Sequence, residues 1–150
     1  MSDEIRYDPP KNKPLGTNNW FRFGAAVLRP ILNLIVRKDW QGAEKIPSSG
    51  AAIVTCNHLS YVDPLTFTHF LYNNGRAPRY LGKKSVFQIP IIGTVIKGAG
   101  QIPVDRESPN AAKAYEHAIA VLKAGHLLGV FPEGTLTRDK NRSEEHTSEL

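Results

Sequence analysis

The chain has little from which to build a disulfide scaffold, a metal cluster or a membrane span. Its 150 residues contain a single cysteine, Cys56, so no internal disulfide can form, and this fits a reducing compartment. Cys and His residues do not stand at the spacing of a zinc site. The most apolar stretch, residues 20–36, is interrupted by arginines, and its longest charge-free run, residues 30–36, is far shorter than the roughly 20 residues of a membrane span. Neither GxGxxG nor a P-loop motif occurs, so a nucleotide-cradling loop is unsupported.

The composition is that of one globular domain. Hydrophobic residues make up 41% of the chain and charged residues 22%, which is typical of a folded rather than a disordered protein. The 19 Lys and Arg residues outnumber the 14 Asp and Glu residues, giving a net charge of +5. A modest positive charge suits nucleic acid, phosphorylated metabolites or an anionic membrane surface.

The organisation along the chain is uneven. Residues 1–18 are polar and rich in proline, which predicts a disordered leader. Residues 19–40 interleave aromatic, aliphatic and basic side chains around Pro30, which predicts two short amphipathic helices lying either in a membrane interface or on the domain's own core. Residues 142–150 resemble the translation of a common sequencing adapter, so we expect a non-native tail and a native chain cut near Asn141. Residues 41–141 then form an incomplete catalytic or binding domain.

Within that domain, strand and helix patterns alternate. Short apolar runs predict strands at residues 51–56, 79–82, 100–104 and 127–131, the first and the last of them buried. Helices are predicted at 64–72 and between Ser108 and Gly125, the latter with Tyr115, Ala118, Ile119 and Leu122 on its apolar face, and a short helix or turn at 90–97. This alternation predicts an α/β fold with a mixed or mostly parallel sheet flanked by helices.

A histidine and a carboxylate follow the first predicted strand. On a regular helix His58 and Asp63 would point about 140° apart, but Pro64 predicts a helix start with Asp63 as its cap, leaving residues 59–62 as a loop that can bring the two together. A carboxylate on one imidazole nitrogen makes the other a general base. The alternative, a solvent-facing loop histidine beside an ordinary cap, stays open at this point. Cys56 lies in the apolar run and is expected to be a core thiol rather than a nucleophile.

Basic residues follow the other predicted strands. Their guanidinium and ammonium groups suit phosphate oxygens, although each alone is equally a solvated surface charge. The backbone N–H groups of Gly134 and Thr135 suit a phosphate or a developing oxyanion. Glu133 is either an acid/base or the ion-pair partner of an arginine. The basic candidates are Lys83, Lys84, Arg106 and Arg138.

Four sequence blocks, in order, resemble the glycerolipid acyltransferases. Residues 57–64 resemble the His-four-residues-Asp motif of that family, residues 80–87 its basic segment, residues 100–106 its second block and residues 131–135 its third. The similarity covers roughly residues 40–139 and is greatest to the 1-acyl-glycerol-3-phosphate acyltransferases. It implies the glycerol-3-phosphate acyltransferase-like fold.

The resemblance implies transfer of a fatty acyl group from acyl-CoA or acyl carrier protein to the free hydroxyl of a lysophospholipid, 1-acyl-glycerol-3-phosphate, giving phosphatidic acid. It implies that His58 is the base, that Asp63 orients it, and that Arg106 with Lys83 or Lys84 holds the phosphate. Glu133 and Gly134 would shape the acceptor site, without a metal or bound organic cofactor. It also implies a peripheral enzyme at the cytoplasmic face of the cell membrane, with no nucleic acid partner.

Two departures from the family pattern stand out. The position directly after the third block usually holds Arg and here holds Leu136, so Arg138 is the candidate replacement. The family's fourth block is missing, as expected of a cut chain. Two alternatives therefore remain, an acyltransferase with another lipid acceptor and a non-catalytic module that binds anionic membranes. Nucleic acid binding is disfavoured because the basic residues do not cluster with aromatics on one element.

Overall fold

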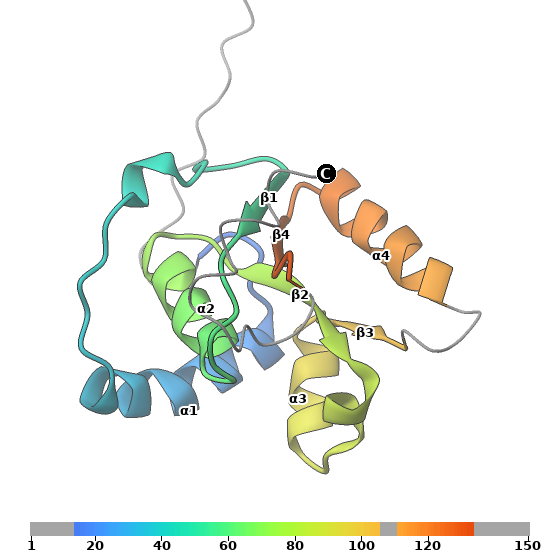
Figure 1. Cartoon of the computed structure of the whole chain (residues 1–150), viewed down its shortest axis with the longest axis horizontal. Helices are drawn as coiled ribbons and strands as arrows, with labels where there is room; N and C mark the ends of the chain where they lie inside the picture. The colour runs from blue at the N-terminus through green and yellow to red at the C-terminus, as the bar shows by residue number, and fades with distance from the viewer. Residues whose placement is uncertain (1–13, 106–110, 134–150) are drawn as a thin grey trace, which may run out of the picture.

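A computed structural model describes residues 14–105 and 111–133 (Figure 1). Its helices are α1 (Asn19–Ile35), α2 (Asp63–Asn73), α3 (Ile92–Gly98) and α4 (Ala111–Lys123), with short 3-10 helices η1 (Ala43–Lys45) and η2 (Lys84–Gln88). Its strands are β1 (Ala52–Thr55), β2 (Pro78–Lys83), β3 (Ile102–Val104) and β4 (Leu127–Val130). Each predicted strand is present, and so are the predicted helices over 64–72 and 90–97. The expected caps Ser108 and Pro109, and residues 142–150, lie outside the described residues.

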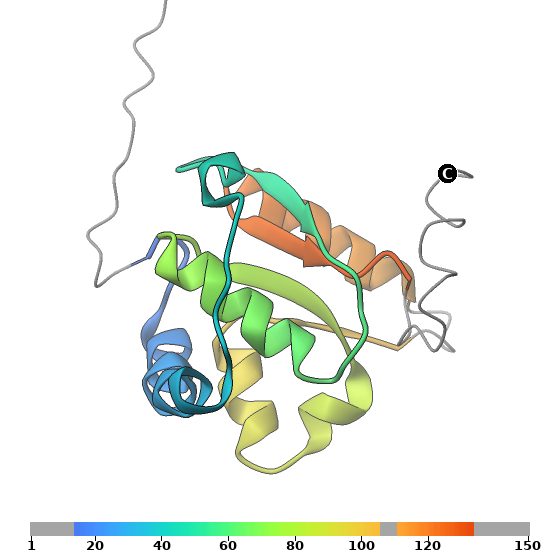
Figure 2. The same cartoon turned by 60° about the vertical axis from the view of Figure 1, so that its left-hand side comes forward.

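The four strands form one parallel sheet in the order β1-β4-β2-β3, which confirms the α/β class. Figures 1 and 2 show α2 and α4 on opposite faces of this sheet, so that it is the middle layer of three. Because all the strands are parallel, their carboxyl ends meet at one edge, where ligands bind in open α/β sheets.

Helix α4 meets the sheet with only part of its predicted apolar face: Ala118 and Leu122 pack there as predicted, but Tyr115 and Ile119 do not. Ala114 and Ala118 pack against Ile102 and Leu128 of the sheet. Tyr115 and Ile119, expected in the core, are 67% and 52% exposed. Small alanine side chains let the helix backbone lie close to the sheet, and apolar periodicity alone does not reveal which of two adjacent stripes meets it.

Strand β1 is half-exposed rather than buried. Among the described residues it has one neighbouring strand, β4, and its side chains alternate between half-buried and exposed. Ile53, on the face that α4 covers further along the sheet, is 59% exposed. A continuous apolar run is therefore compatible with an edge strand as well as a central one.

The N-terminal segment is more ordered than predicted. Leu15 pairs with the chain beside β2, donating to the Gly75 carbonyl at 2.8 Å. Asn18 caps α1 by accepting from the Phe21 N–H at 2.9 Å. The prediction of a disordered leader is thus wrong for residues 14–18, while residues 1–13 lie outside the described part of the chain.

A single helix, α1, replaces the two short helices expected around Pro30. Pro30 lies inside its 17 residues, on the exposed side, so the helix continues through a residue that lacks a backbone N–H donor. Its buried Phe21 packs with Tyr72, Ala77 and Ala99. Within the described residues, no helix is long and apolar enough to cross a bilayer.

Polar contacts join α1 to α2. The buried His69 Nε2 lies 3.0 Å from Asn33 Oδ1, and Arg29 Nη2 donates to Asn73 Oδ1 at 2.7 Å. Burial lowers the pKa of His69, and the positive charges of Lys38 and Arg29 lower it further. The neutral imidazole is therefore the form that suits this helix contact.

Candidate active site

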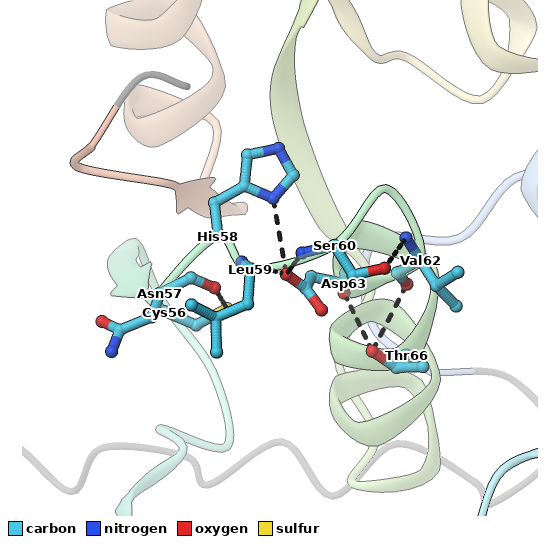
Figure 3. A network of polar contacts seen from close by, with 8 residues as sticks. All are labelled: Cys56, Asn57, His58, Leu59, Ser60, Val62, Asp63 and Thr66. Carbon is cyan, nitrogen blue, oxygen red and sulfur yellow. Dashed lines mark hydrogen bonds and ion pairs between the residues drawn. The ribbon is translucent and has the colours of Figure 1, made fainter. Parts of the chain in front are cut away.

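The loop between β1 and α2 brings His58 and Asp63 together (Figure 3). His58 Nδ1 lies 3.5 Å from Asp63 Oδ2, and the two side chains are 18% and 25% exposed. The same oxygen accepts hydrogen bonds from the backbone N–H groups of Leu59 and Ser60, each at 2.6 Å. The predicted backbone turn between the two residues is therefore present, and the backbone holds the carboxylate.

One detail of that turn differs from the prediction. Asp63 is the first residue of α2, and Val62 precedes the helix without a side-chain cap. The Asp63 carboxylate turns back to the loop instead, because the N–H groups of Leu59 and Ser60 compete for it successfully. The residue expected to cap the helix fixes the loop that carries the histidine.

The imidazole is oriented for proton transfer. Its Nδ1 faces the carboxylate, while the other ring nitrogen points away from Asp63 (Figure 3). A proton on Nδ1 is favoured by the nearby negative charge, and Nε2 then carries the free lone pair. The arrangement can accept a proton from a substrate hydroxyl and stabilise the imidazolium that forms.

Phe131 packs against the imidazole and Tyr80 packs against Phe131, a row of three rings that the sequence motifs did not reveal. The His58 and Phe131 ring centroids are 4.6 Å apart, and those of Phe131 and Tyr80 are 5.6 Å apart. The strand alternation carried the signal: Val54, Gly129 and Tyr80 are in register across β1, β4 and β2, and Phe131 is two residues beyond Gly129.

A groove of about 310 Å³ adjoins the loop that carries the pair. Aromatic side chains from α2 and from the segment that follows α1 form part of its wall, and the strand-end loop forms another part. Its lining residues are Asp39, Trp40, Gln41, Cys56, Asn57, Leu59, Asp63, Thr66, Phe67 and Phe70. The predicted site thus has a largely apolar neighbour, which the sequence motifs did not reveal.

Cys56 lies in this groove as a protonated thiol. Its burial, followed by the charges of Asp63 and Glu133, raises its pKa to about 11. The thiolate, the nucleophilic form, is thus scarce at neutral pH. Cys56 is half-buried rather than fully in the core, but its chemistry matches the expectation that it is not a nucleophile.

The remaining candidates fall into two groups. Lys83 ends β2 and is exposed, and Lys84 Nζ contacts Asp105 Oδ2 at 3.2 Å, at the same sheet edge as His58. Glu133 follows β4 as His58 follows β1, at the carboxyl end of the sheet, and its charge contributes to the raised pKa of Cys56. Four candidates lie outside the described residues, namely Arg106, Gly134, Thr135 and Arg138. Within the described residues, His, Cys, Asp and Glu side chains form no group able to hold a metal ion.

The sequence is similar to one protein family and to several enzymes that share a name. The acyltransferase family model matches residues 37–148. The chain is 32% identical over 122 residues to the 1-acyl-sn-glycerol-3-phosphate acyltransferase of Bacillus subtilis, covering 79% of this chain and 58% of that protein. The enzyme of the same name from Borreliella burgdorferi is 38% identical, over 65% of this chain and 38% of the relative. A chloroplastic enzyme of that name from Brassica napus is 31% identical, over 69% of this chain and 29% of the relative.

The chain therefore spans less than two thirds of the length of these relatives. No solved structure matches it significantly. The family model covers most of the chain, and the His58–Asp63 pair and the parallel sheet lie within the matched range. The chain belongs to the acyltransferase family.

Proposed function

We propose that the protein transfers a fatty acyl group from acyl-CoA or acyl carrier protein to the free hydroxyl of 1-acyl-glycerol-3-phosphate, giving phosphatidic acid. The observation that carries the proposal is the contact between His58 Nδ1 and Asp63 Oδ2, 3.5 Å, with the second imidazole nitrogen directed away from the carboxylate. The names of the relatives support this acceptor.

The proposed reaction is a direct displacement. Nε2 of His58 removes the proton from the acceptor hydroxyl as its oxygen attacks the thioester carbonyl carbon. The tetrahedral intermediate collapses by breaking the carbon–sulfur bond, and the imidazolium returns its proton to the leaving thiolate. The Asp63 carboxylate stabilises the transient positive charge on His58, since it lies against Nδ1. The protein forms no covalent intermediate, in keeping with the protonated Cys56.

The phosphate of the acceptor is proposed to bind at the cationic edge of the sheet. Lys83 and Lys84 supply charge there, and the Lys84–Asp105 pair is exposed and therefore weak enough to exchange Asp105 for a phosphate. Arg106 and Arg138 are the proposed guanidinium contacts, and Glu133, Gly134 and Thr135 the proposed walls of the acceptor site. The acyl chain is proposed to enter the groove beside Trp40 and Phe67.

We also propose that α1 attaches the protein to the cytoplasmic face of a membrane as a peripheral protein. Large apolar side chains are exposed along this helix at helical spacing, among them Phe23, Val27, Ile31 and Leu34, the last 87% exposed. An apolar stripe of this kind on a helix with arginines suits the boundary between headgroups and acyl chains. The same stripe favours the second candidate function, a non-catalytic module that binds anionic membranes.

The test of acyl transfer uses the complete native protein with acyl-CoA and lysophosphatidic acid, with phosphatidic acid measured by mass spectrometry. We expect product from the wild type and a loss of about 10²- to 10⁴-fold in His58→Gln. His117→Gln, on the exposed side of α4, is the matched control and should keep full activity. Full activity in His58→Gln, or no product from the wild type with either thioester donor, would refute the proposal.

Co-sedimentation with vesicles tests the membrane surface separately. Val27→Glu should weaken binding to vesicles containing phosphatidic acid, because it places a charge in the apolar stripe. Ile119→Glu, on the exposed face of α4, is the matched control. Vesicle binding that survives His58→Gln, without any acyl transfer by the wild type, would favour the binding module. Equal binding by the two Glu variants would exclude α1 as the docking element.

A further inference from the structure

The contact with Asp63 alone does not fix the plane of the His58 ring. At 3.5 Å the Nδ1–Oδ2 separation exceeds the 2.7–3.2 Å of a usual N–H···O hydrogen bond. The same oxygen already accepts from two backbone N–H groups. One contact at one atom restrains the position of Nδ1 but leaves the imidazole free to rotate, and rotation moves Nε2, the proposed proton acceptor.

Phe131 supplies a second constraint. Its ring lies against the imidazole with centroids 4.6 Å apart and planes inclined by 32°, so the two faces cover each other in part. Phe131 follows β4, and His58 follows β1, the neighbouring parallel strand. The contact thus joins the residue directly after β4 to the loop that follows β1, at the ends of two paired strands.

Tyr80 holds Phe131 from the other side. Their rings stack at 5.6 Å with planes 20° apart. The Tyr80 ring fits only because residue 129 is glycine: a Cβ there would come within 2.1 Å of Tyr80 Cε1. The Tyr80 hydroxyl lies 3.3 Å from the hydroxyl of Thr68 on α2. This contact links Tyr80 to the helix that begins with Asp63.

We propose that Phe131, supported by Tyr80, is the positioning residue that sets the plane of the His58 imidazole and so aims Nε2 at the acceptor hydroxyl. This rests on the proposed function for its catalytic consequence, but the ring geometry itself stands independently of any activity. Phe131 touches no substrate in this account and acts through His58. Aromatic pairs prefer such offset geometries over a face-to-face sandwich because of their ring quadrupoles, and leucine has no π system with which to make this contact.

Nuclear magnetic resonance of the full chain tests the geometry without substrate. We expect nuclear Overhauser contacts between the ring protons of His58 and Phe131, and ring-current shifts of the His58 protons, assigned by their loss in His58→Gln. Phe131→Leu should move these signals toward free-histidine values, and Phe131→Tyr should restore them. Phe87→Leu is the matched control: it truncates another buried phenylalanine, packed against Gly82, and should leave the His58 signals unchanged.

Kinetics of the complete native protein then test the consequence. In Phe131→Leu we expect kcat to fall about tenfold, while KM for both substrates stays within about twofold of the wild-type value. The reason is that substrate binding is intact and only the orientation of His58 Nε2 changes. Phe131→Tyr should recover most of kcat, and Phe87→Leu should not lose it.

The outcomes separate the two proposals. Absent Overhauser contacts between His58 and Phe131 in the wild type would overturn the positioning role, even if Phe131→Leu fails to fold and whatever the activity. Unchanged His58 signals in a folded Phe131→Leu, or an unchanged kcat, would do the same. Wild-type protein that shows the ring contacts but no acyl transfer would refute the proposed function while supporting the geometry.

Discussion

Replacing Asp63 by Asn isolates the negative charge at the proposed active site. Asparagine keeps a carbonyl oxygen that can accept from Leu59 and Ser60, so the loop geometry survives while the charge beside His58 disappears. The neutral amide no longer stabilises an imidazolium, and it no longer favours the proton on Nδ1. The substitution therefore tests electrostatics rather than the shape of the loop.

The separation of 3.5 Å between His58 Nδ1 and Asp63 Oδ2 sets the size of the expected loss in rate. Coulomb's law gives about 1 kcal/mol for two unit charges at this distance in bulk water and about 5 kcal/mol at an effective dielectric of about 20. Because both side chains are mostly buried, the value lies toward the upper part of that range. At about 1.4 kcal/mol per factor of ten, kcat should fall about 10²- to 10³-fold.

The assay is phosphatidic acid formation from acyl-CoA and lysophosphatidic acid by the complete native protein, with folding checked by circular dichroism. Glu116→Gln, which removes one carboxylate from the exposed side of α4, is the control for net charge and should keep at least half of the activity. A folded Asp63→Asn enzyme with kcat within threefold of wild type would show that the carboxylate does not stabilise the base, and the electrostatic reasoning would fail.

Three further predictions concern packing, reactivity and pH. Gly129→Ala should lower the free energy of unfolding, measured in urea, by about 1–3 kcal/mol, because the new Cβ would come within 2.1 Å of the Tyr80 ring. Gly24→Ala, inside α1 with only an ordinary contact, should raise it by about 0.5–1 kcal/mol. Two changes of the same sign would contradict this. Cys56, with its pKa raised to about 11, should react with iodoacetamide at pH 8 at least about tenfold more slowly than an ordinary thiol, since a hundredfold loss of thiolate is only partly offset by greater nucleophilicity; equal rates would refute it. The pKa of His69 is lowered from 6.5, so its contribution to stability is complete above pH 6.5 and is lost as pH falls through the lower folded-state value. As the pH falls, the free energy of unfolding of the wild type should therefore drop more steeply than that of His69→Gln, by at most about 1.4 kcal/mol per pH unit. The same pH dependence of the free energy of unfolding in both proteins, measured with urea, would disprove this.

The sequence determined the local elements because their signals come from near neighbours. An apolar run after a turn located β1, and Pro64 located the start of α2 to within one residue. Gly125 marked the end of α4, two residues beyond its last helical residue. The spacing of His58 and Asp63 around the proline was sufficient to predict the loop that joins them, and the order of the motifs was sufficient to predict the family.

Only the tertiary structure decided which of these elements meet. The order β1-β4-β2-β3 places the chain after β1 beside the chain after β4, more than 70 residues later, so that His58 meets Phe131. It also leaves β1 at an edge and selects Ala114, beside the predicted Ala118, rather than Tyr115 to face the sheet. The physical reason is that periodicity and turn chemistry act over a few residues, while the choice of packing partner minimises exposed apolar surface over the whole domain.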